Sequence, residues 1–220
     1  MTLLDVIPLR PAAAAATLGV LLLAACGGST ATTQPTAKPT LPPVQACAAS
    51  QLPQAGFVPD PAHSGPLSVA KYSPSGDIQA ALVYFHFENG VRQVFTDLPA
   101  TASPGAAAGA AGPVSPHDVL VVCDAIEFRD ADGARGFVGS FRQFRLDNKQ
   151  TESSPPAIAD RQVGFIDHDQ SFSGYPIQHA EGAEIATARG TRFYSVSVFG
   201  TSPTLQTAAA ILRAVLGAGQ

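Results

Sequence analysis

The sequence predicts an α+β domain in which an antiparallel sheet carries its helices on one face. Three observations predict this class. The segment at 118–128 is β-branched and apolar, which is typical of a central strand. An amphipathic segment at 130–147 follows it directly, and three further strand patterns precede a closing helix. The order of strand, helix, three strands and helix favours an antiparallel sheet with the helices on one side.

The helix predicted after the central strand places its apolar side chains at positions i, i+3, i+4 and i+7. One face therefore packs on a core. Asp130 or Asp132 can cap its first turn. The apolar positions are Ala134, Phe137, Val138 and Phe141.

Strands are predicted at 161–169, 183–189 and 192–200, and the last two pair through a turn at Arg189-Gly190-Thr191. Alternation in the last strand places Tyr194 and Val196 on one face and Phe193 on the other. A final helix has Ser202 as its cap, Pro203 in its first turn and Gly217 at its end. Its apolar stripe is Leu205, Ala208, Ala209, Leu212 and Leu216.

The segment at 77–90 fits two structures. Ile78, Ala81, Leu82 and Phe85 have helical spacing, with Asp77 as a cap and Gly90 as a stop. Phe85 also alternates with Val83 and Phe87, so a hairpin that turns at Asn89-Gly90 is the alternative. We favour the helix over 78–87, followed by a strand at 91–96.

The N-terminus has the pattern of an export signal. Residues 1–25 hold Arg10 before an uncharged Ala/Leu-rich run that is shorter than the roughly 20 residues a spanning helix needs. Leu23-Ala24-Ala25-Cys26 resembles the lipobox of bacterial lipoproteins. That resemblance implies that Cys26 receives a diacylglycerol and becomes the first residue of the mature chain. A secretory signal cut elsewhere is the alternative.

Composition then divides the rest of the chain. Residues 26–46 hold the lipidated Cys26 and a Thr/Pro-rich tether with too little apolar surface to fold. Residues 47–220 form a single domain with a low-complexity loop at about 98–116. The mature chain is expected on the extracytoplasmic face of the cell membrane, held by its lipid.

With Cys26 lipidated, Cys47 and Cys123 form an even pair in an oxidising compartment, and we predict a disulfide between them. Two separate thiols are the alternative.

The net charge of −4 and only 13 Lys and Arg residues argue against nucleic acid as a partner.

The pattern over 118–217 is similar to small extracytoplasmic lipoprotein domains. It runs from "FRDADGARGFV" through "VGFID" to "ARGTRFYSVSVFG" and a closing helix. Such domains are similar to the PsbP/Mog1-like group and to extracellular sensor domains of mycobacterial receptor kinases. The resemblance implies a fold and a binding or scaffolding role, and no catalytic motif.

No residue pattern predicts a catalytic site, a metal site or a cofactor. His168 lies between Asp167 and Asp169, with His179 further on, but this is no known ligand spacing. Ser140, Cys123 and the carboxylates Asp124 and Glu127 also lack the neighbours that a catalytic role needs. Arg142 and Arg145 could hold an anion, but a solvated helix face explains them better.

The sequence therefore predicts a membrane-tethered, non-catalytic binding or accessory module of the cell envelope. Its partners are the membrane, through the lipid anchor, and an unidentified envelope protein or small ligand. The alternative is an envelope hydrolase that uses Asp167, His168 or Asp124 in a cleft.

Overall fold

The computed structural model describes residues 43–53, 56–97, 120–170, 175, 180–200 and 203–218. The chain separates into two compact units, 1–41 and 42–220, of which only the second is described. The predicted signal peptide, Cys26, the tether up to residue 42 and the loop at 98–116 lie outside the described residues.

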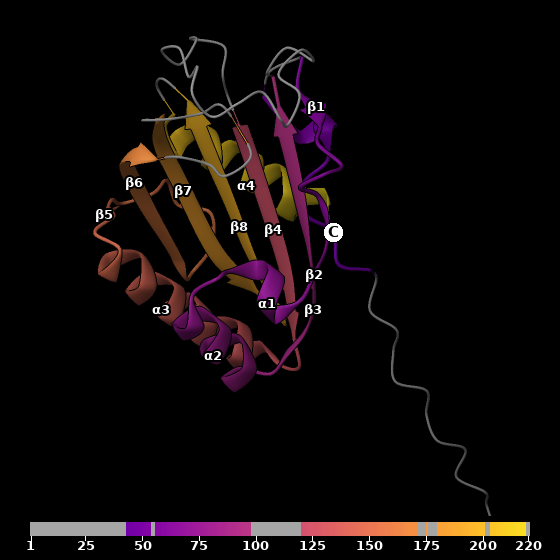
Figure 1. Cartoon of the computed structure of the whole chain (residues 1–220), viewed down its shortest axis with the longest axis vertical. Helices are drawn as coiled ribbons and strands as arrows, with labels where there is room; N and C mark the ends of the chain where they lie inside the picture. The colour runs from indigo at the N-terminus through magenta and orange to yellow at the C-terminus, as the bar shows by residue number, and fades with distance from the viewer. Residues whose placement is uncertain are drawn as a thin grey trace, which may run out of the picture. The chain divides into compact units, whose positions relative to one another are not determined.

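An antiparallel sheet of eight strands forms the middle of the described unit (Figure 1). The strand order is β1-β3-β4-β8-β7-β6-β5, and β2 pairs with β3 beside β1. This confirms the predicted α+β class and the antiparallel sheet. The strands are β1 (Val58–Pro59), β2 (Gly65–Leu67), β3 (Phe87–Thr96), β4 (Leu120–Phe128), β5 (Thr151–Glu152), β6 (Gln162–Gln170), β7 (Ala180–Arg189) and β8 (Arg192–Gly200).

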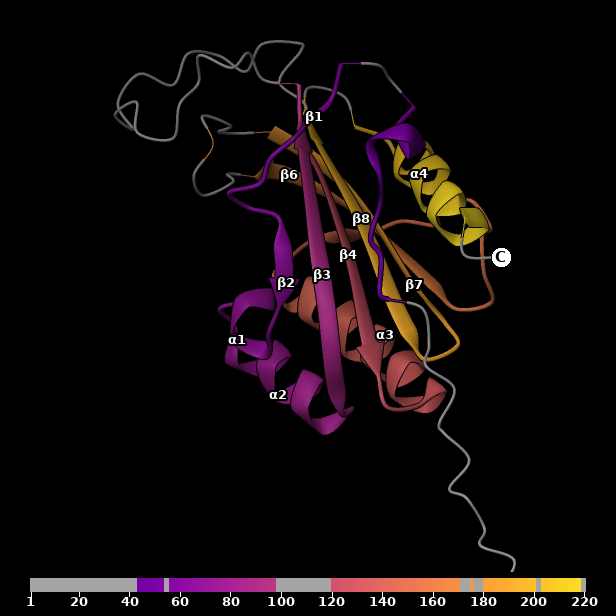
Figure 2. The same ribbon diagram turned by 90° about the vertical axis from the view of Figure 1, so that its right-hand side faces the viewer.

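The helices cover both faces of the sheet, so the predicted one-sided arrangement is wrong (Figure 2). The long helix α4 packs on one face, and α1, α2 and α3 pack on the other. We call these the α4 face and the α3 face. The helices are a short 3-10 turn η1 (Ala49–Gln51), α1 (Val69–Tyr72), α2 (Gly76–Tyr84), α3 (Ala131–Asp147) and α4 (Leu205–Ala218).

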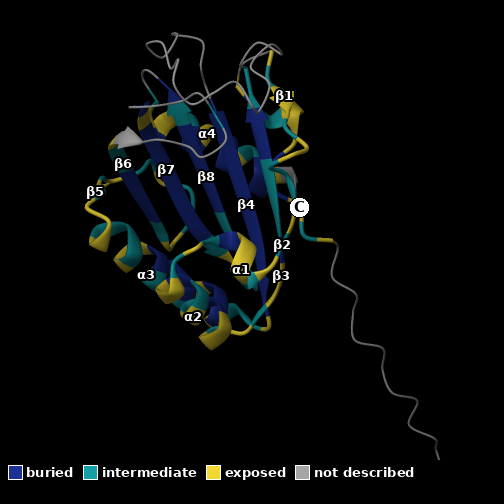
Figure 3. Cartoon of the chain, viewed as in Figure 1, coloured by how far each residue is buried: buried dark blue, intermediate teal, exposed yellow. Residues whose placement is uncertain are grey.

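Strand β4 explains why both faces are covered, because all nine of its residues are buried (Figure 3). Val121 and Cys123 belong to the core under α4, whereas Ile126 and Phe128 belong to the core under α2 and α3. A strand with apolar side chains on both faces exposes apolar area on both sides, and a single layer of helices cannot remove both from water.

The segment that fitted two structures is a helix followed by a strand, which confirms the favoured prediction. Helix α2 ends at Tyr84, His86 reverses the chain with a φ of 60°, and β3 begins at Phe87. The predicted stop at Gly90 is wrong, because Gly90 lies within β3. A Cβ there would lie 3.2 Å from the carbonyl oxygen of Ala125, so glycine permits close packing against β4.

The two long helices follow their predicted patterns. Asp130 caps α3 by accepting a hydrogen bond from the Gly133 amide at 2.8 Å, and the four predicted apolar positions are buried. In α4, the Thr204 hydroxyl accepts the Thr207 amide at 3.1 Å. The predicted cap, Ser202, lies outside the described residues. Among the described helices, none has the length and apolarity to cross a membrane.

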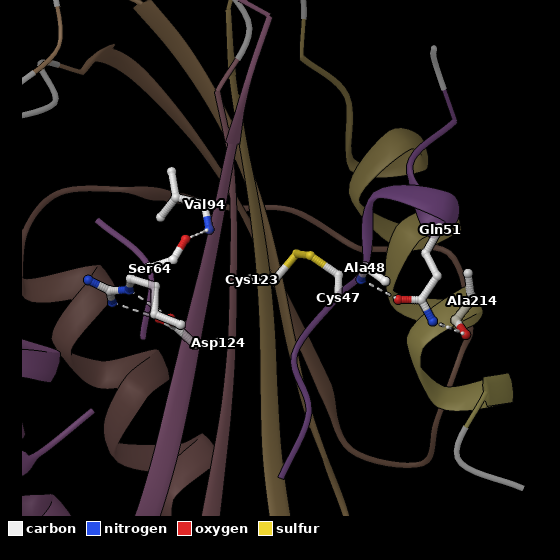
Figure 4. The surroundings of a disulfide bond; sticks show 9 residues. Cys47, Ala48, Gln51, Ser64, Val94, Cys123, Asp124 and Ala214 are labelled. Carbon is white, nitrogen blue, oxygen red and sulfur yellow. Dashed lines mark hydrogen bonds and ion pairs between the residues drawn. A yellow bond between two sulfur atoms is a disulfide. The ribbon is translucent and has the colours of Figure 1, made fainter. Parts of the chain in front are cut away.

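The predicted disulfide joins Cys47 to Cys123 of β4, 76 residues further along the chain (Figure 4). Cys47 lies on the α4 face, and Gln51 next to it donates a side-chain hydrogen bond to the Ala214 carbonyl of α4 at 3.0 Å. Ala46 is buried and Val44 packs against the same core. The packed chain therefore begins a few residues before the predicted boundary at 47.

Candidate functional site

The α3 face carries a groove of about 1110 Å³ between the helices and the sheet. Strands β3, β4, β8 and β7 form its floor. Helices α1 and α2 supply one part of its lining, and the C-terminal half of α3 supplies another. Figure 1 shows these helices on the same face of the sheet. The charged and hydroxyl groups on or above the floor are Tyr72, Arg92, Asp124, Arg145, Glu184 and Ser197.

The first ion pair of the groove joins neighbouring strands. Arg92 of β3 lies opposite Asp124 of β4 in the sheet register. Its Nε and Nη2 each donate to one carboxylate oxygen of Asp124 at 2.7 Å, and Nη2 also lies 3.4 Å from the Tyr72 carbonyl. The Asp124 side chain is only 7% exposed. Two-pronged pairing of this kind fixes both side chains and is stronger than a single contact.

The second ion pair connects α3 to the sheet. Arg145 Nη2 donates to Glu184 Oε1 at 2.8 Å, and the Ser197 hydroxyl donates to the same oxygen at 2.7 Å. Arg145 Nε lies 2.7 Å from Oε2 without the alignment of a hydrogen bond. The guanidinium also stacks 4.7 Å from the centre of the Phe141 ring. These contacts hold the end of α3 above β7.

Strand register explains why these polar groups share one band. Asp124 pairs with Arg92 on one side, and Ser197 pairs with Glu184 across the next two strands. Alternation places all four side chains on the α3 face. Asp124 and Glu184 interrupt otherwise apolar strands, and that interruption is the signal in the sequence that identifies the band.

The groove has more acidic than basic groups. Asp77, Asp124, Asp147 and Glu184 line it, against Arg92 and Arg145. Burial raises the pKa of the Tyr72 hydroxyl, and the Asp124 carboxylate adds to that rise. Burial opposes the charge on Arg92, but the Asp124 carboxylate outweighs it and raises the pKa of the guanidinium. Arg92 thus remains charged and bound to its carboxylate.

The residues weighed for catalysis are not brought together. Asp124 lies on the groove floor, whereas Asp167 of β6 accepts a hydrogen bond from Gln150 at 2.6 Å. His168 is 69% exposed, and its Nδ1 lies 3.7 Å from Glu181. The side chain of Asp169 and the whole of His179 lie outside the described residues. In the described ranges, no group of three potential ligands has the geometry of a metal site.

The other residues weighed from sequence have separate places. Cys123 is in the disulfide, and Ser140 lines the groove from α3. Glu127 accepts hydrogen bonds from Arg192 and from the Thr191 hydroxyl. Arg142 pairs with Glu152 through two contacts of 2.6 Å, and Arg145 pairs with Glu184. Both guanidinium groups already hold carboxylates, which agrees with the sequence-based preference against an anion-binding pair.

A second polar cluster connects the β1–β2 segment to Tyr175. Asp60 Oδ2 lies 2.8 Å from His63 Nδ1 and accepts a hydrogen bond from the Tyr175 hydroxyl. Burial opposes the charge on Asp60, but the hydrogen bonds from Tyr175 and His63 lower the pKa of its carboxyl. Burial, and then the bond to Asp60, raises the pKa of Tyr175.

Comparison with known proteins gives a likeness in structure but none in sequence. The sequence matches no family model and no curated protein sequence. The structure is similar to the crystal structure of the extracellular domain of PknH from Mycobacterium tuberculosis. The TM-score is 0.47 at 12% identity, over 80% of this chain and 98% of that one. The resemblance to lipoproteins and to PsbP/Mog1-like domains stays a prediction.

Proposed function

We propose that this chain is a lipid-anchored, extracytoplasmic binding module whose groove on the α3 face takes an amine-bearing ligand or partner segment. The lipobox supports the anchor, because Cys26 follows two alanines at the end of a short apolar run. The disulfide between Cys47 and Cys123 supports an oxidising compartment outside the cytosol.

The groove is the observation that carries the binding role. Its volume of about 1110 Å³ is slightly above the usual range for small-ligand sites, so it leaves room for a ligand or a short segment. Its floor is fixed by two ion pairs, so a ligand meets groups that are already held in place. Tyr72 and Phe144 supply aromatic surface at the walls, and Ser73 and Asn148 supply hydrogen-bonding groups.

The charge balance of the groove favours amines over anions. Arg92 and Arg145 are committed to Asp124 and Glu184, so they are poor anchors for an anion. Asp77 and Asp147 lie exposed at the rim and supply the remaining negative charge. A protonated amine gains from both carboxylates.

Binding is tested with the full mature chain in detergent and a short oligolysine peptide, followed by calorimetry. The same peptide with acetylated side chains is the ligand control. We expect Asp77→Asn with Asp147→Asn to weaken binding several-fold and Glu88→Gln, outside the groove, to leave it unchanged. Equal binding of acetylated and free peptide contradicts the proposed charge recognition, and turnover of a substrate that depends on Asp124 contradicts the non-catalytic role.

The anchor is tested separately by mass spectrometry of the mature protein. We expect an N-terminal Cys26 that carries acyl chains, and release of the Cys26→Ser chain from the membrane fraction. An unmodified thiol at Cys26 contradicts the anchor and leaves the binding role of the groove to stand on its own test.

A further inference from the structure

A second hollow, of about 690 Å³, lies away from the groove and is lined by arginines. It forms where the turn between β7 and β8, the segment at 158–161 and the end of α4 meet the first half of α3. Its basic residues are Arg135, Arg161, Arg189 and Arg213, and Asp160 is the single acidic residue in its lining. The charge of this hollow is thus opposite in sign to that of the whole chain, which is −4.

The hydrogen bonds of these arginines leave most of the positive charge uncompensated. Arg189 Nη1 donates to the Leu216 carbonyl at 2.6 Å, and Arg213 Nη2 donates to the Ala157 carbonyl at 3.2 Å. A carbonyl oxygen accepts a hydrogen bond but carries no full negative charge. In the part of the chain that the structure describes, only Arg135 of the four has an ion pair, with Asp132.

The elements around the hollow are held in place before any ligand arrives. The amide oxygen of Gln162 accepts hydrogen bonds from Ile158 at 2.8 Å and Ala159 at 3.2 Å. The Thr187 hydroxyl donates to the Arg161 carbonyl at 2.5 Å, which ties the segment to β7. Gly190 adopts a φ of 57° in the tight turn beside Arg189. The backbone that carries the guanidinium groups is therefore fixed, which lowers the entropic cost of binding.

Capping of the C-terminus of α4 explains the position of only some of these four arginines. Cations are favourable near the C-terminus of a helix, and Arg189 donates to the Leu216 carbonyl at that end of α4. Arg213 belongs to α4 but lies before its last turn. Arg161 comes from the segment before β6 and Arg135 from α3, so neither is part of α4 and neither is needed to cap it. Two further positive charges beside a capped helix end repel one another unless an anion lies between them.

We propose that this hollow binds an oxyanion, a phosphate or phosphate-like group, through Arg161, Arg189 and Arg213. The planar guanidinium presents paired N–H donors that match two oxygens of such a group. Each of the three arginines has donors beyond those that its described hydrogen bonds use. The group can come from a soluble phosphate compound or from an anionic lipid headgroup, and the two sources share this chemistry.

The soluble source is tested by NMR titration of the full chain carrying Cys26→Ser with inorganic phosphate. We expect the largest amide shifts at 158–161 and 189–190, and a loss of affinity of at least tenfold in Arg161→Gln with Arg213→Gln. Arg142→Gln is the matched control, because Arg142 is also exposed but already holds Glu152. The single variant Arg161→Gln, which removes no described side-chain hydrogen bond, guards against a folding defect and is expected to weaken binding several-fold.

The lipid source is tested by flotation of the same chain with vesicles of phosphatidylglycerol and phosphatidylcholine, and with phosphatidylcholine alone. The proposal is supported, with a lipid headgroup as the source, if the parent and the control bind to the anionic vesicles and the double variant does not. Phosphate binding without flotation supports it with a soluble ligand. If neither probe binds, or if the variants and the control respond alike, the proposal is overturned. A failure of the groove to bind amines has no bearing on either result.

Discussion

Cys47 is bonded to Cys123 at the centre of β4, so the first residues of the described domain are covalently attached to its most buried strand. The bond lies against α4, and it closes a loop that contains α1, α2 and β3. Everything between the two cysteines therefore folds as a closed segment whose ends cannot separate.

Removal of this bond tests its energetic contribution. We expect Cys47→Ala with Cys123→Ala to lower the free energy of unfolding by about 4 kcal/mol, because a loop of this length loses much chain entropy when it is closed. Urea unfolding followed by circular dichroism measures the change. Cys26→Ser is the control and should have no effect on the domain. A double variant as stable as the parent contradicts the pairing.

The ion pair on the groove floor gives a second prediction. Asp124→Ala leaves the guanidinium of Arg92 in a largely buried site without its carboxylate. We expect a loss of about 3 kcal/mol of stability, which is the usual cost of breaking a buried pair. The matched control is Arg142→Met, which breaks the exposed pair with Glu152 and should leave the unfolding midpoint nearly unchanged. Equal effects of the two substitutions contradict the assigned burial.

Two glycines of α3 provide a matched test of its packing. A Cβ on Gly133 would lie 2.6 Å from the carbonyl oxygen of Phe85, whereas a Cβ on Gly139 meets nothing within 4 Å. We expect Gly133→Ala to destabilise the domain by about 1–3 kcal/mol, because the backbone between α2 and β3 must move. Gly139→Ala should stabilise it by about 0.5–1 kcal/mol through helix propensity. Thermal unfolding of both variants decides whether α2 and α3 approach this closely.

The Asp60 cluster predicts a dependence of stability on pH. The pKa of Asp60 is lowered in the folded state, so its carboxylate contributes stability above its unfolded pKa, for which the reference value is 3.8. That contribution is lost as the pH falls through the lowered folded value. We expect the stability difference between the parent and Asp60→Asn to be constant near neutral pH and to shrink below about pH 4. Urea unfolding across this range measures it, and parallel pH profiles of the two chains would count against the cluster.

Much of the fold follows from short-range patterns in the sequence. The spacing of Phe137 and Phe141 predicts the buried face of α3, and Asp130 caps that helix as expected. The turn at Gly190 joins β7 to β8 as predicted. These features depend on residues a few positions apart, so local periodicity and turn chemistry contain the necessary information.

The covering of both faces and the groove depend on distant residues. Helix α4 could be recognised by its stripe, but which face it covers depends on how β4 is placed in the sheet. The same holds for Arg145, which reads as a solvated helix position until Glu184 is placed beneath it. Arg161, Arg189 and Arg213 likewise come together only through the ends of β7 and α4. The spacing of residues in the sequence does not show which residues of two distant strands lie opposite each other in the sheet.

Short strands cover parts of both edges of the sheet, which affects how neighbouring copies of the protein can pair. On one side β1 and β2 pair with parts of β3. On the other side β5 pairs with β6, and the Ser153 amide donates to the Gly164 carbonyl at 2.9 Å. Strand β3 thus offers little free backbone to a neighbouring molecule, whereas β5 covers only the middle of β6. Crowded copies therefore cannot add strands at the β3 edge, and because continuous growth of a sheet needs two open edges, a high local density should not lead to fibres.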